Sequence, residues 1–306
     1  MHLAEGMLPL NQAIVWSALA APAVLWSLRG EQQVRDTPSS SVIMAGATSL
    51  LFAGTLLPLP VPVVGATSHI CLTPVLSLIV GVRRIVWPTF FVLLLQAVFF
   101  AHGGLTTLGS NTLTLGLLGP LTTAGLWAVF HRIGFNGALG LAVACGVGGL
   151  SVYVADAVVL AMALSDVTAP ATTFGAVLLG FAPVQVPLSV LEAIASVGIV
   201  RLLATRRPDL LPKALRTFRA GPIRDTSIVG LLLMIGLSGC AYEGIDGTVF
   251  GATAEGAGRP PTESIVDLSQ GEMGLAMTIL ILFGLGFLAG RSWERLFGGE
   301  HGALPR

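Results

Sequence analysis

Residues 137–164 read GALGLAVACGVGGLSVYVADAVVLAMAL, an apolar run in which Asp156 is the only charged side chain. An α-helix rises about 1.5 Å per residue and the hydrocarbon core of a bilayer is about 30 Å thick, so about 20 apolar residues are enough to cross it. The run is longer than this minimum. It therefore predicts a membrane-spanning helix and, with it, an integral membrane protein.

The composition of the whole chain indicates the same class. Of its 306 residues, 54% are hydrophobic and 10% are charged, and the mean hydropathy is +0.84. Soluble domains carry about 25% charged residues. The formal net charge is zero. We therefore expect contacts with membrane lipid and none with nucleic acid.

Apolar windows separated by polar residues, Pro or Gly can be placed along the chain. The nine windows are 9–28, 41–58, 70–82, 85–101, 113–130, 137–164, 172–204, 225–241 and 272–290. The third and fourth windows are short and only Arg83 and Arg84 separate them, so they predict a tight hairpin. The expected fold class is an all-α integral membrane protein with nine spans.

The distribution of Lys and Arg predicts the orientation, because positively charged loops stay in the cytoplasm. With the N-terminus outside, only Arg259 of the 16 Lys and Arg residues falls on the outer side. Glu5 lies where a cleaved signal peptide would carry positive charge. We therefore expect a multi-pass protein of the cell membrane with a retained, external amino terminus.

Three of the five histidines, His2, His69 and His102, fall on the outer side, each beside apolar sequence. A free Met1-His2 end offers its amine, the backbone nitrogen of His2 and the Nδ1 atom of His2 as three corners of a square, which one more imidazole closes. Four nitrogens in a plane suit Ni²⁺ or Cu²⁺ better than Zn²⁺, Mg²⁺ or Ca²⁺. The alternative is that His2 is a polar residue of an outer tail.

Four separated stretches resemble one family. They are MHLAEGMLP at 1–9, GATSH at 65–69, HGGLTTLGSNTL at 102–113 and QVPLSVLEA at 185–193. They are similar to motifs of the CbiM/NikM family, the membrane-embedded substrate-binding components of nickel and cobalt importers of the energy-coupling-factor (ECF) class. The resemblance covers about residues 1–205 and implies a seven-helix bundle in that part of the chain.

The resemblance also implies a site and partners. The Met1 nitrogen, both His2 nitrogens and His69 would bind Ni²⁺ or Co²⁺ as the transported substrate, with no bound cofactor. Residues expected to support these ligands are Glu5, Thr67, Ser68, His102 and Asn111. The partners would be an ECF transmembrane coupling protein and separate ATPase subunits, since this chain has no P-loop motif. The sequence does not choose between nickel and cobalt.

The family often shows Pro-Thr-Gly after the histidine of the second stretch, whereas here residues 70–74 read ICLTP. Cys71 is therefore open to two interpretations, a thiolate ligand for a softer metal or a buried structural thiol. Asp156 and Glu192 lie inside predicted spans, where a charge is costly. They are expected to belong to a buried network, with direct metal ligation as the alternative.

The chain is expected to divide into two modules. The basic segment 206–224 contains Pro at both ends and predicts a cytoplasmic linker between a metal-binding domain, 1–205, and a two-span module, 225–306. This second module resembles the CbiN/NikN auxiliary subunit. Its outer loop, 242–271, is acidic, and two interpretations are open, attraction of divalent cations or a solvated connector.

Two other classes of function were weighed. Residues 236–239, GLSG, have the letters of an intramembrane serine hydrolase motif centred on Ser238, but the only later histidine, His301, falls on the opposite side of the membrane. A non-transporting membrane scaffold or sensor is the second alternative. We expect a transporter component and not an enzyme, because only this function uses the amino terminus.

Overall fold

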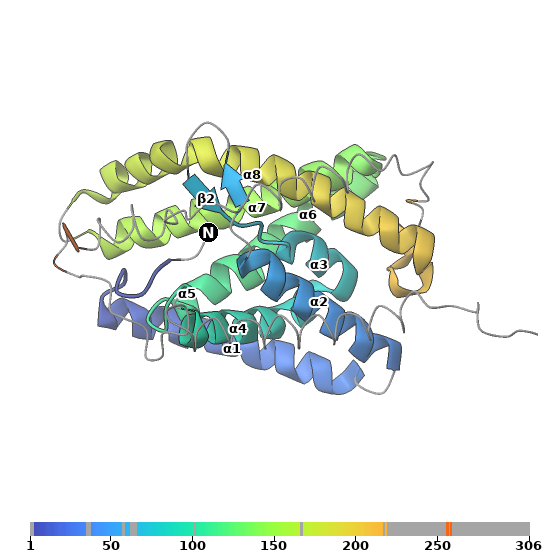
Figure 1. The fold of residues 1–306 in the computed structure, drawn as a ribbon, viewed down its shortest axis with the longest axis horizontal. Helices are drawn as coiled ribbons and strands as arrows, with labels where there is room; N and C mark the ends of the chain where they lie inside the picture. Colours follow the sequence, from blue (N-terminus) through green and yellow to red (C-terminus); the bar gives the residue numbers. More distant parts are fainter. Residues whose placement is uncertain are drawn as a thin grey trace, which may run out of the picture.

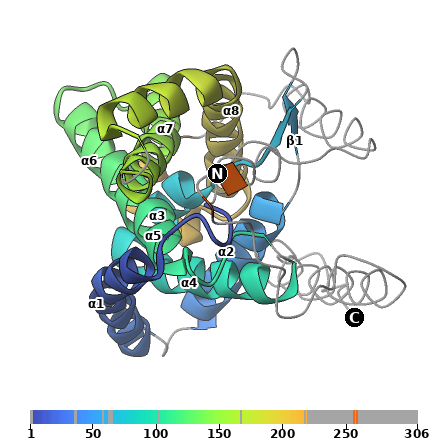
Figure 2. The ribbon, with the colours of Figure 1, turned by 90° about the vertical axis from the view of Figure 1, so that its left-hand side faces the viewer.

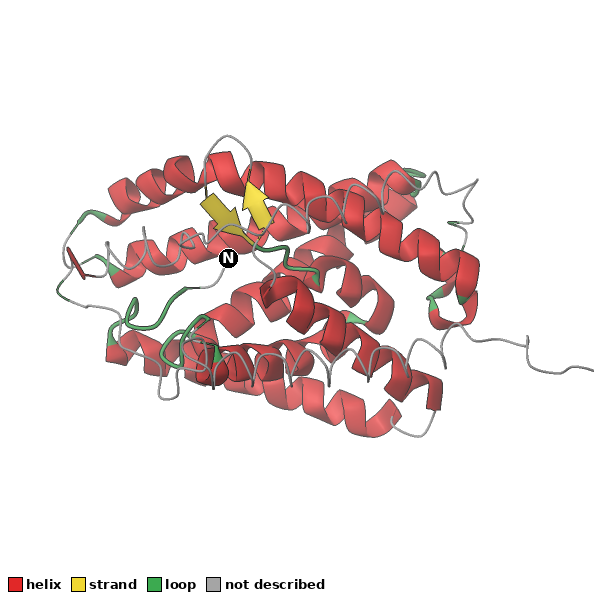
Figure 3. Cartoon of the chain, in the orientation of Figure 1, coloured by secondary structure: helices red, strands yellow, loops and turns green. Residues whose placement is uncertain are grey.

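The computed structural model describes residues 3–34, 38–56, 59–61, 66–100, 102–165, 168–216, 218, 255–256 and 258. Figures 1 and 3 show that this part of the chain is a helical bundle with one short ribbon. The α-helices are α1 (Leu10–Val34), α2 (Pro38–Leu56), α3 (Thr73–Val80), α4 (Val82–Phe99), α5 (Leu108–Leu113), α6 (Gly119–Arg132), α7 (Ala138–Ala163) and α8 (Pro170–Arg206). The all-α class is therefore confirmed.

Shorter elements connect these helices. β1 (Leu59–Val61) pairs antiparallel with β2 (Ala66–Ser68), and a π-helical segment, η1 (Thr114–Leu118), joins α5 to α6. Two 3-10 turns, Pro208–Leu210 and Lys213–Leu215, follow α8. Neither the ribbon nor the π segment was expected from the sequence, in which 113–130 reads as one uniform apolar span.

Five helical segments in the described residues are long and apolar enough to cross a membrane. They are Leu10–Gly30, Val82–Phe99, Leu108–Arg132, Ala138–Ala163 and Pro170–Arg206, and Val42–Leu56 is a shorter apolar helix. Each of the first seven predicted windows contains a helix. Residues 206–216 and 218 of the predicted linker are described, whereas the eighth and ninth windows and almost all of the predicted second module lie outside the described residues, so these last two spans stay predictions.

The third predicted span is the main correction. Helix α3 has 8 residues, which is about 12 Å of helix and too short to cross the bilayer. The chain reaches its first turn through an irregular buried segment, His69–Leu72. The hairpin with α4 is confirmed, but the residue that separates the two helices is Gly81, at φ 98°, and not the Arg83-Arg84 pair, which lies in the first turn of α4. A positive φ favours glycine at this turn.

Helix α3 occupies the interior of the bundle. Seven of its residues are buried, and it packs against α2, α4, α6 and α7. Figure 2 shows it near the centre when the bundle is seen from one end. Its side chain Leu76 belongs to an apolar core cluster. The same cluster contains Leu51 of α2, Trp127 of α6 and Leu141 of α7. The irregular segment before α3 is therefore held inside the protein and away from lipid.

The amino-terminal segment belongs to a second core cluster. Leu3, Met7 and Leu8 are buried together with Leu160 of α7 and Phe181 of α8. Helices α7 and α8 lie side by side along much of their length (Figure 1). Because apolar side chains at the very start of the chain pack against them, this segment is part of the fold and not a loose tail.

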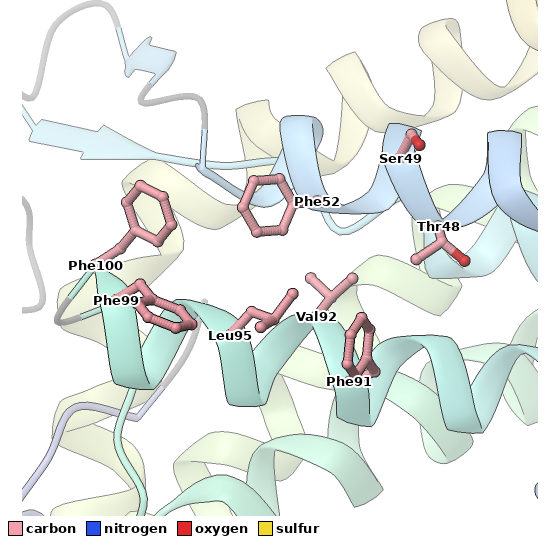
Figure 4. Close-up of a pocket in the computed structure, with 8 residues that line it drawn as sticks. All are labelled: Thr48, Ser49, Phe52, Phe91, Val92, Leu95, Phe99 and Phe100. Carbon is pink, nitrogen blue, oxygen red and sulfur yellow. The ribbon is translucent and has the colours of Figure 1, made fainter. Parts of the chain in front are cut away.

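An apolar pocket lies between α2 and α4. Figure 4 shows its lining, which comprises Thr48, Ser49, Phe52, Phe91, Val92, Leu95, Phe99 and Phe100. The rings of Phe52 and Phe100 meet edge to face, 5.8 Å apart. The lining carries no charged or imidazole side chain, so the pocket does not have the chemistry of a cation site.

Candidate metal site

Leu3 is held by two side chains at the start of α5, those of Thr107 and Asn111. Its backbone N–H donates to Asn111 Oδ1 at 2.9 Å, and its carbonyl oxygen accepts from Asn111 Nδ2 at 3.1 Å and from Thr107 Oγ1 at 2.7 Å. Leu3 is 0% exposed. One asparagine therefore satisfies both backbone groups of Leu3, as a neighbouring strand would.

Glu5 is the second point of attachment. Its Oε2 accepts from the backbone N–H of Thr106 at 3.2 Å, and the N–H of Gly6 donates to Thr106 Oγ1 at 3.3 Å. A Cβ on Gly104 would lie 2.6 Å from the Cα of Glu5, so only glycine leaves room for this approach. The loop 102–107 and the segment 3–8 fit against each other through backbone contacts.

His69 and His102 meet although 33 positions separate them in the sequence. Their ring centroids are 5.3 Å apart with the planes inclined at 68°. His69, at the start of the buried segment before α3, is 4% exposed, and its Nδ1 lies 3.5 Å from the carbonyl oxygen of Ile70. The predicted outer-side histidines of the described chain therefore form one pair.

Burial sets the charge of both imidazoles. It lowers the pKa of His69 well below its ordinary value and lowers the pKa of His102 to about 4. Both rings are therefore neutral at neutral pH. The neutral imidazole is the form that ligates a metal ion.

A polar network missed by sequence reasoning lies behind His102. The His102 ring hydrogen-bonds the backbone carbonyl of Thr55 at the end of α2. Gln96 of α4 donates from Nε2 to Thr55 Oγ1 at 2.7 Å, and Thr55 and Gln96 are both 0% exposed. A glutamine inside an apolar window was the available signal, because a buried amide needs partners.

These contacts make the segment 102–111 a common support. Its first residue touches His69, while its later residues, Thr106, Thr107 and Asn111, hold Glu5 and Leu3. The amino-terminal segment and the loop of His69 are thus brought to the same place by one stretch of chain.

Comparison with known proteins identifies the family of this chain. Residues 2–210 match the family described as "Cobalt uptake substrate-specific transmembrane region", CbiM. The chain belongs to this family. A "Cobalt transport protein CbiM" of Geobacter sulfurreducens is 35% identical over 97% of this chain and 90% of the relative. Its namesake in Sorangium cellulosum is 37% identical over 72% of this chain and 99% of the relative.

A solved structure has the same fold. The crystal structure of a truncated transition metal transporter covers 66% of this chain and 97% of its own, with a TM-score of 0.57 at 20% identity. The resemblance to the CbiM family is thus confirmed by the family match and by the relatives, and the solved structure shows a shared fold.

In this CbiM-family chain, several predicted site residues cannot be placed. Met1 and His2 lie outside the described residues, as do Ser238 and His301. Thr67 and Ser68 stand in β2, opposite Pro60 and Leu59, and their side chains are not among those described. Within the described part of the chain, no group of three or more His, Cys, Asp or Glu side chains is arranged to hold a metal.

Cys71 behaves as a structural thiol in the CbiM fold. It is 5% exposed, and burial raises its pKa to about 12, with the carboxylates of Glu192 and Asp156 acting in the same direction. The thiol is therefore protonated in the metal-free protein, and burial in apolar surroundings is typical of a structural thiol. This favours the second of the two interpretations of Cys71.

The two carboxylates within the spans are deeply buried. Asp156 in α7 is 0% exposed and Glu192 in α8 is 2% exposed. Glu192 Oε1 accepts from the backbone N–H of Leu72 at 2.8 Å. Glu192 therefore has a buried contact, with the segment that follows His69, whereas the predicted network role of Asp156 stays a prediction.

Proposed function

We propose that this protein is the substrate-capturing membrane component of a cobalt or nickel importer in the cell membrane. Membership of the CbiM family, relatives named cobalt transport proteins and a fold like that of a transition metal transporter support this. One observation supports the proposal most strongly: the stretch 102–111 holds the amino-terminal segment and also contacts His69.

The proposed ligands are the Met1 amine, the backbone nitrogen and Nδ1 of His2, and an imidazole nitrogen of His69. Consecutive Cα atoms are about 3.8 Å apart, so the Cα of Met1 lies within about 8 Å of that of Leu3, whose position Asn111 sets. His69 is neutral and ready to ligate. Four nitrogen ligands suit Ni²⁺ and the neighbouring Co²⁺, both of which accept imidazole.

His102 and Asn111 support this site without being ligands. His102 packs against the ring of His69 and is itself held by Thr55, while Asn111 holds Leu3. Groups that orient ligands in this way typically change metal affinity by about 10–100-fold. Glu5 has the same role through Thr106.

Transport requires partners. We propose that an ECF transmembrane coupling protein and separate ATPase subunits drive release of the ion, because this chain has no P-loop. The proposed division at 206–224 is supported by the range of the family match, which ends at residue 210, and by relatives that align with only about 70% of this chain. The serine-hydrolase alternative depends on Ser238, which lies outside the described residues.

The decisive experiment is stoichiometric Co²⁺ and Ni²⁺ binding to the purified full-length protein. We expect one ion per chain and loss of binding in His2→Ala. An extra residue before Met1 moves the amine out of register while leaving every side chain in place, so it should abolish binding, whereas a C-terminal tag should not.

Native affinity in the N-terminally extended protein would refute the amine ligand. Native affinity in His2→Ala would refute the whole proposed ligand set. Competition between the two ions on the unmodified chain decides between nickel and cobalt.

A further inference from the structure

We propose that Glu192 is the positioning residue of the His69 loop: its carboxylate accepts a backbone hydrogen bond from the segment His69–Leu72 and thereby sets where the His69 imidazole stands. This inference rests on the proposed function, because it assigns His69 as a metal ligand. It concerns a contact between residues 120 positions apart, between α8 and the irregular start of α3.

The segment has no regular structure to hold it. All four of its residues are buried, and Leu72 has a φ of 58°, the left-handed region that a leucine rarely adopts. No side-chain hydrogen bond caps the N-terminus of α3 at Leu72. Buried backbone N–H groups in such a segment need acceptors from elsewhere in the protein.

Glu192 supplies such an acceptor. Its Oε1 accepts from the N–H of Leu72 at 2.8 Å, and the backbone of Cys71 lies close enough to stabilise the charged carboxylate. These are the residues two and three positions after His69, so one side chain on α8 holds the connection between the imidazole and α3.

The neighbouring helices leave room for this arrangement. A Cβ on Gly149 of α7 would lie 2.5 Å from Glu192 Oε2, and a Cβ on Gly54 of α2 would lie 2.5 Å from Leu72 Cδ1. The carboxylate and the leucine therefore occupy space that any other residue at these two helix positions would restrict. Leu72 thus packs against α2, while the carboxylate that holds it, on α8, lies against α7.

Two conservative variants separate positioning from charge. Glu192→Gln keeps a carbonyl oxygen at the same reach and removes the charge, whereas Glu192→Asp keeps the charge and draws the acceptor back by one methylene. Positioning predicts that Glu192→Gln binds Co²⁺ within about threefold of the native protein and that Glu192→Asp binds about 10–100-fold more weakly. The reverse order would mean that the charge acts on the ion, and it would overturn the proposal.

Ser189→Ala is the matched control, since Ser189 lies one turn earlier on α8 and its Oγ donates locally to the Val186 carbonyl. It should bind Co²⁺ normally. An equal loss in this control would overturn the proposal by showing that any change in this part of α8 acts on the site.

A second measurement does not depend on metal. Hydrogen exchange of the peptide covering 69–72 in the metal-free protein should be faster in Glu192→Asp than in the native protein and in Ser189→Ala. Unchanged exchange would overturn the positioning role. If the native protein binds no Co²⁺ or Ni²⁺ while the exchange result holds, the proposed function fails and the structural assignment of Glu192 to this loop survives.

Discussion

At the residue scale, single side chains connect segments that are far apart in the sequence. Asn111 bonds both backbone groups of Leu3, Glu5 accepts from Thr106, and Glu192 accepts from Leu72. Each of these polar groups is at least partly removed from water, so its partner cannot be lost without leaving an unsatisfied group. The position of the amino terminus therefore depends on a few specific residues.

Asn111 can be tested directly. Asn111→Asp keeps an acceptor for the N–H of Leu3 but loses the donor to its carbonyl, and Asn111→Ala loses both. We expect Co²⁺ affinity to fall in both variants, by about 10–100-fold in the alanine variant, because the amine and His2 are no longer held in register.

Ser110→Ala is the control for this series, because Ser110 is also buried and its Oγ donates locally to the carbonyl of Thr107. Equilibrium titration of the purified variants provides the measurement. Native Co²⁺ affinity in both Asn111 variants would show that Asn111 does not support the metal site.

At the scale of elements, the candidate site lies where regular structure stops. The loop between α4 and α5 contacts both the amino-terminal segment before α1 and the irregular segment before α3. Long helices provide the rigid frame, and the loops between them carry the imidazoles and the backbone contacts. Because α3 begins only at Thr73, the segment that carries His69 lies outside regular helix.

Gly104 tests the fit between two of these segments. Gly104→Ala places a methyl group against the backbone of Glu5, which no rotamer change relieves. We expect weaker Co²⁺ binding and a loss of stability of about 1–3 kcal/mol, the usual cost of overpacking.

Gly125→Ala in α6 is the matched control, since nothing lies within 4 Å of its added Cβ. Titration with Co²⁺ and thermal unfolding of the purified proteins provide the two measurements. A Gly104→Ala protein with native affinity and stability would show that the amino-terminal segment moves freely away from this loop.

At the scale of the whole molecule, the chain extends beyond the part that contains the proposed site. The family match ends at residue 210, and two apolar windows follow in 225–306. All proposed ligands and supporting residues lie between Met1 and Glu192. Capture and transport are therefore expected to depend on different parts of the chain.

Truncation after about residue 220 tests this division. The remaining protein should bind Co²⁺ or Ni²⁺ as the full chain does, because every proposed ligand and support is retained, whereas uptake by cells should fall sharply. Metal titration of the purified protein and uptake of labelled Co²⁺ provide the two readouts. A folded truncated protein that fails to bind the ion would require ligands from the second module.

The sequence by itself determined the fold class, the positions of the first seven apolar segments, the family and the set of nitrogen ligands to propose. These follow from local signals: the length of apolar runs, the distribution of charge and four short motifs. The tertiary structure alone decided that α3 is too short to span, that His69 meets His102, and that Asn111 and Glu192 hold Leu3 and Leu72. Contacts between residues 33 to 120 positions apart depend on how the helices pack, and hydrophobic periodicity does not encode that packing.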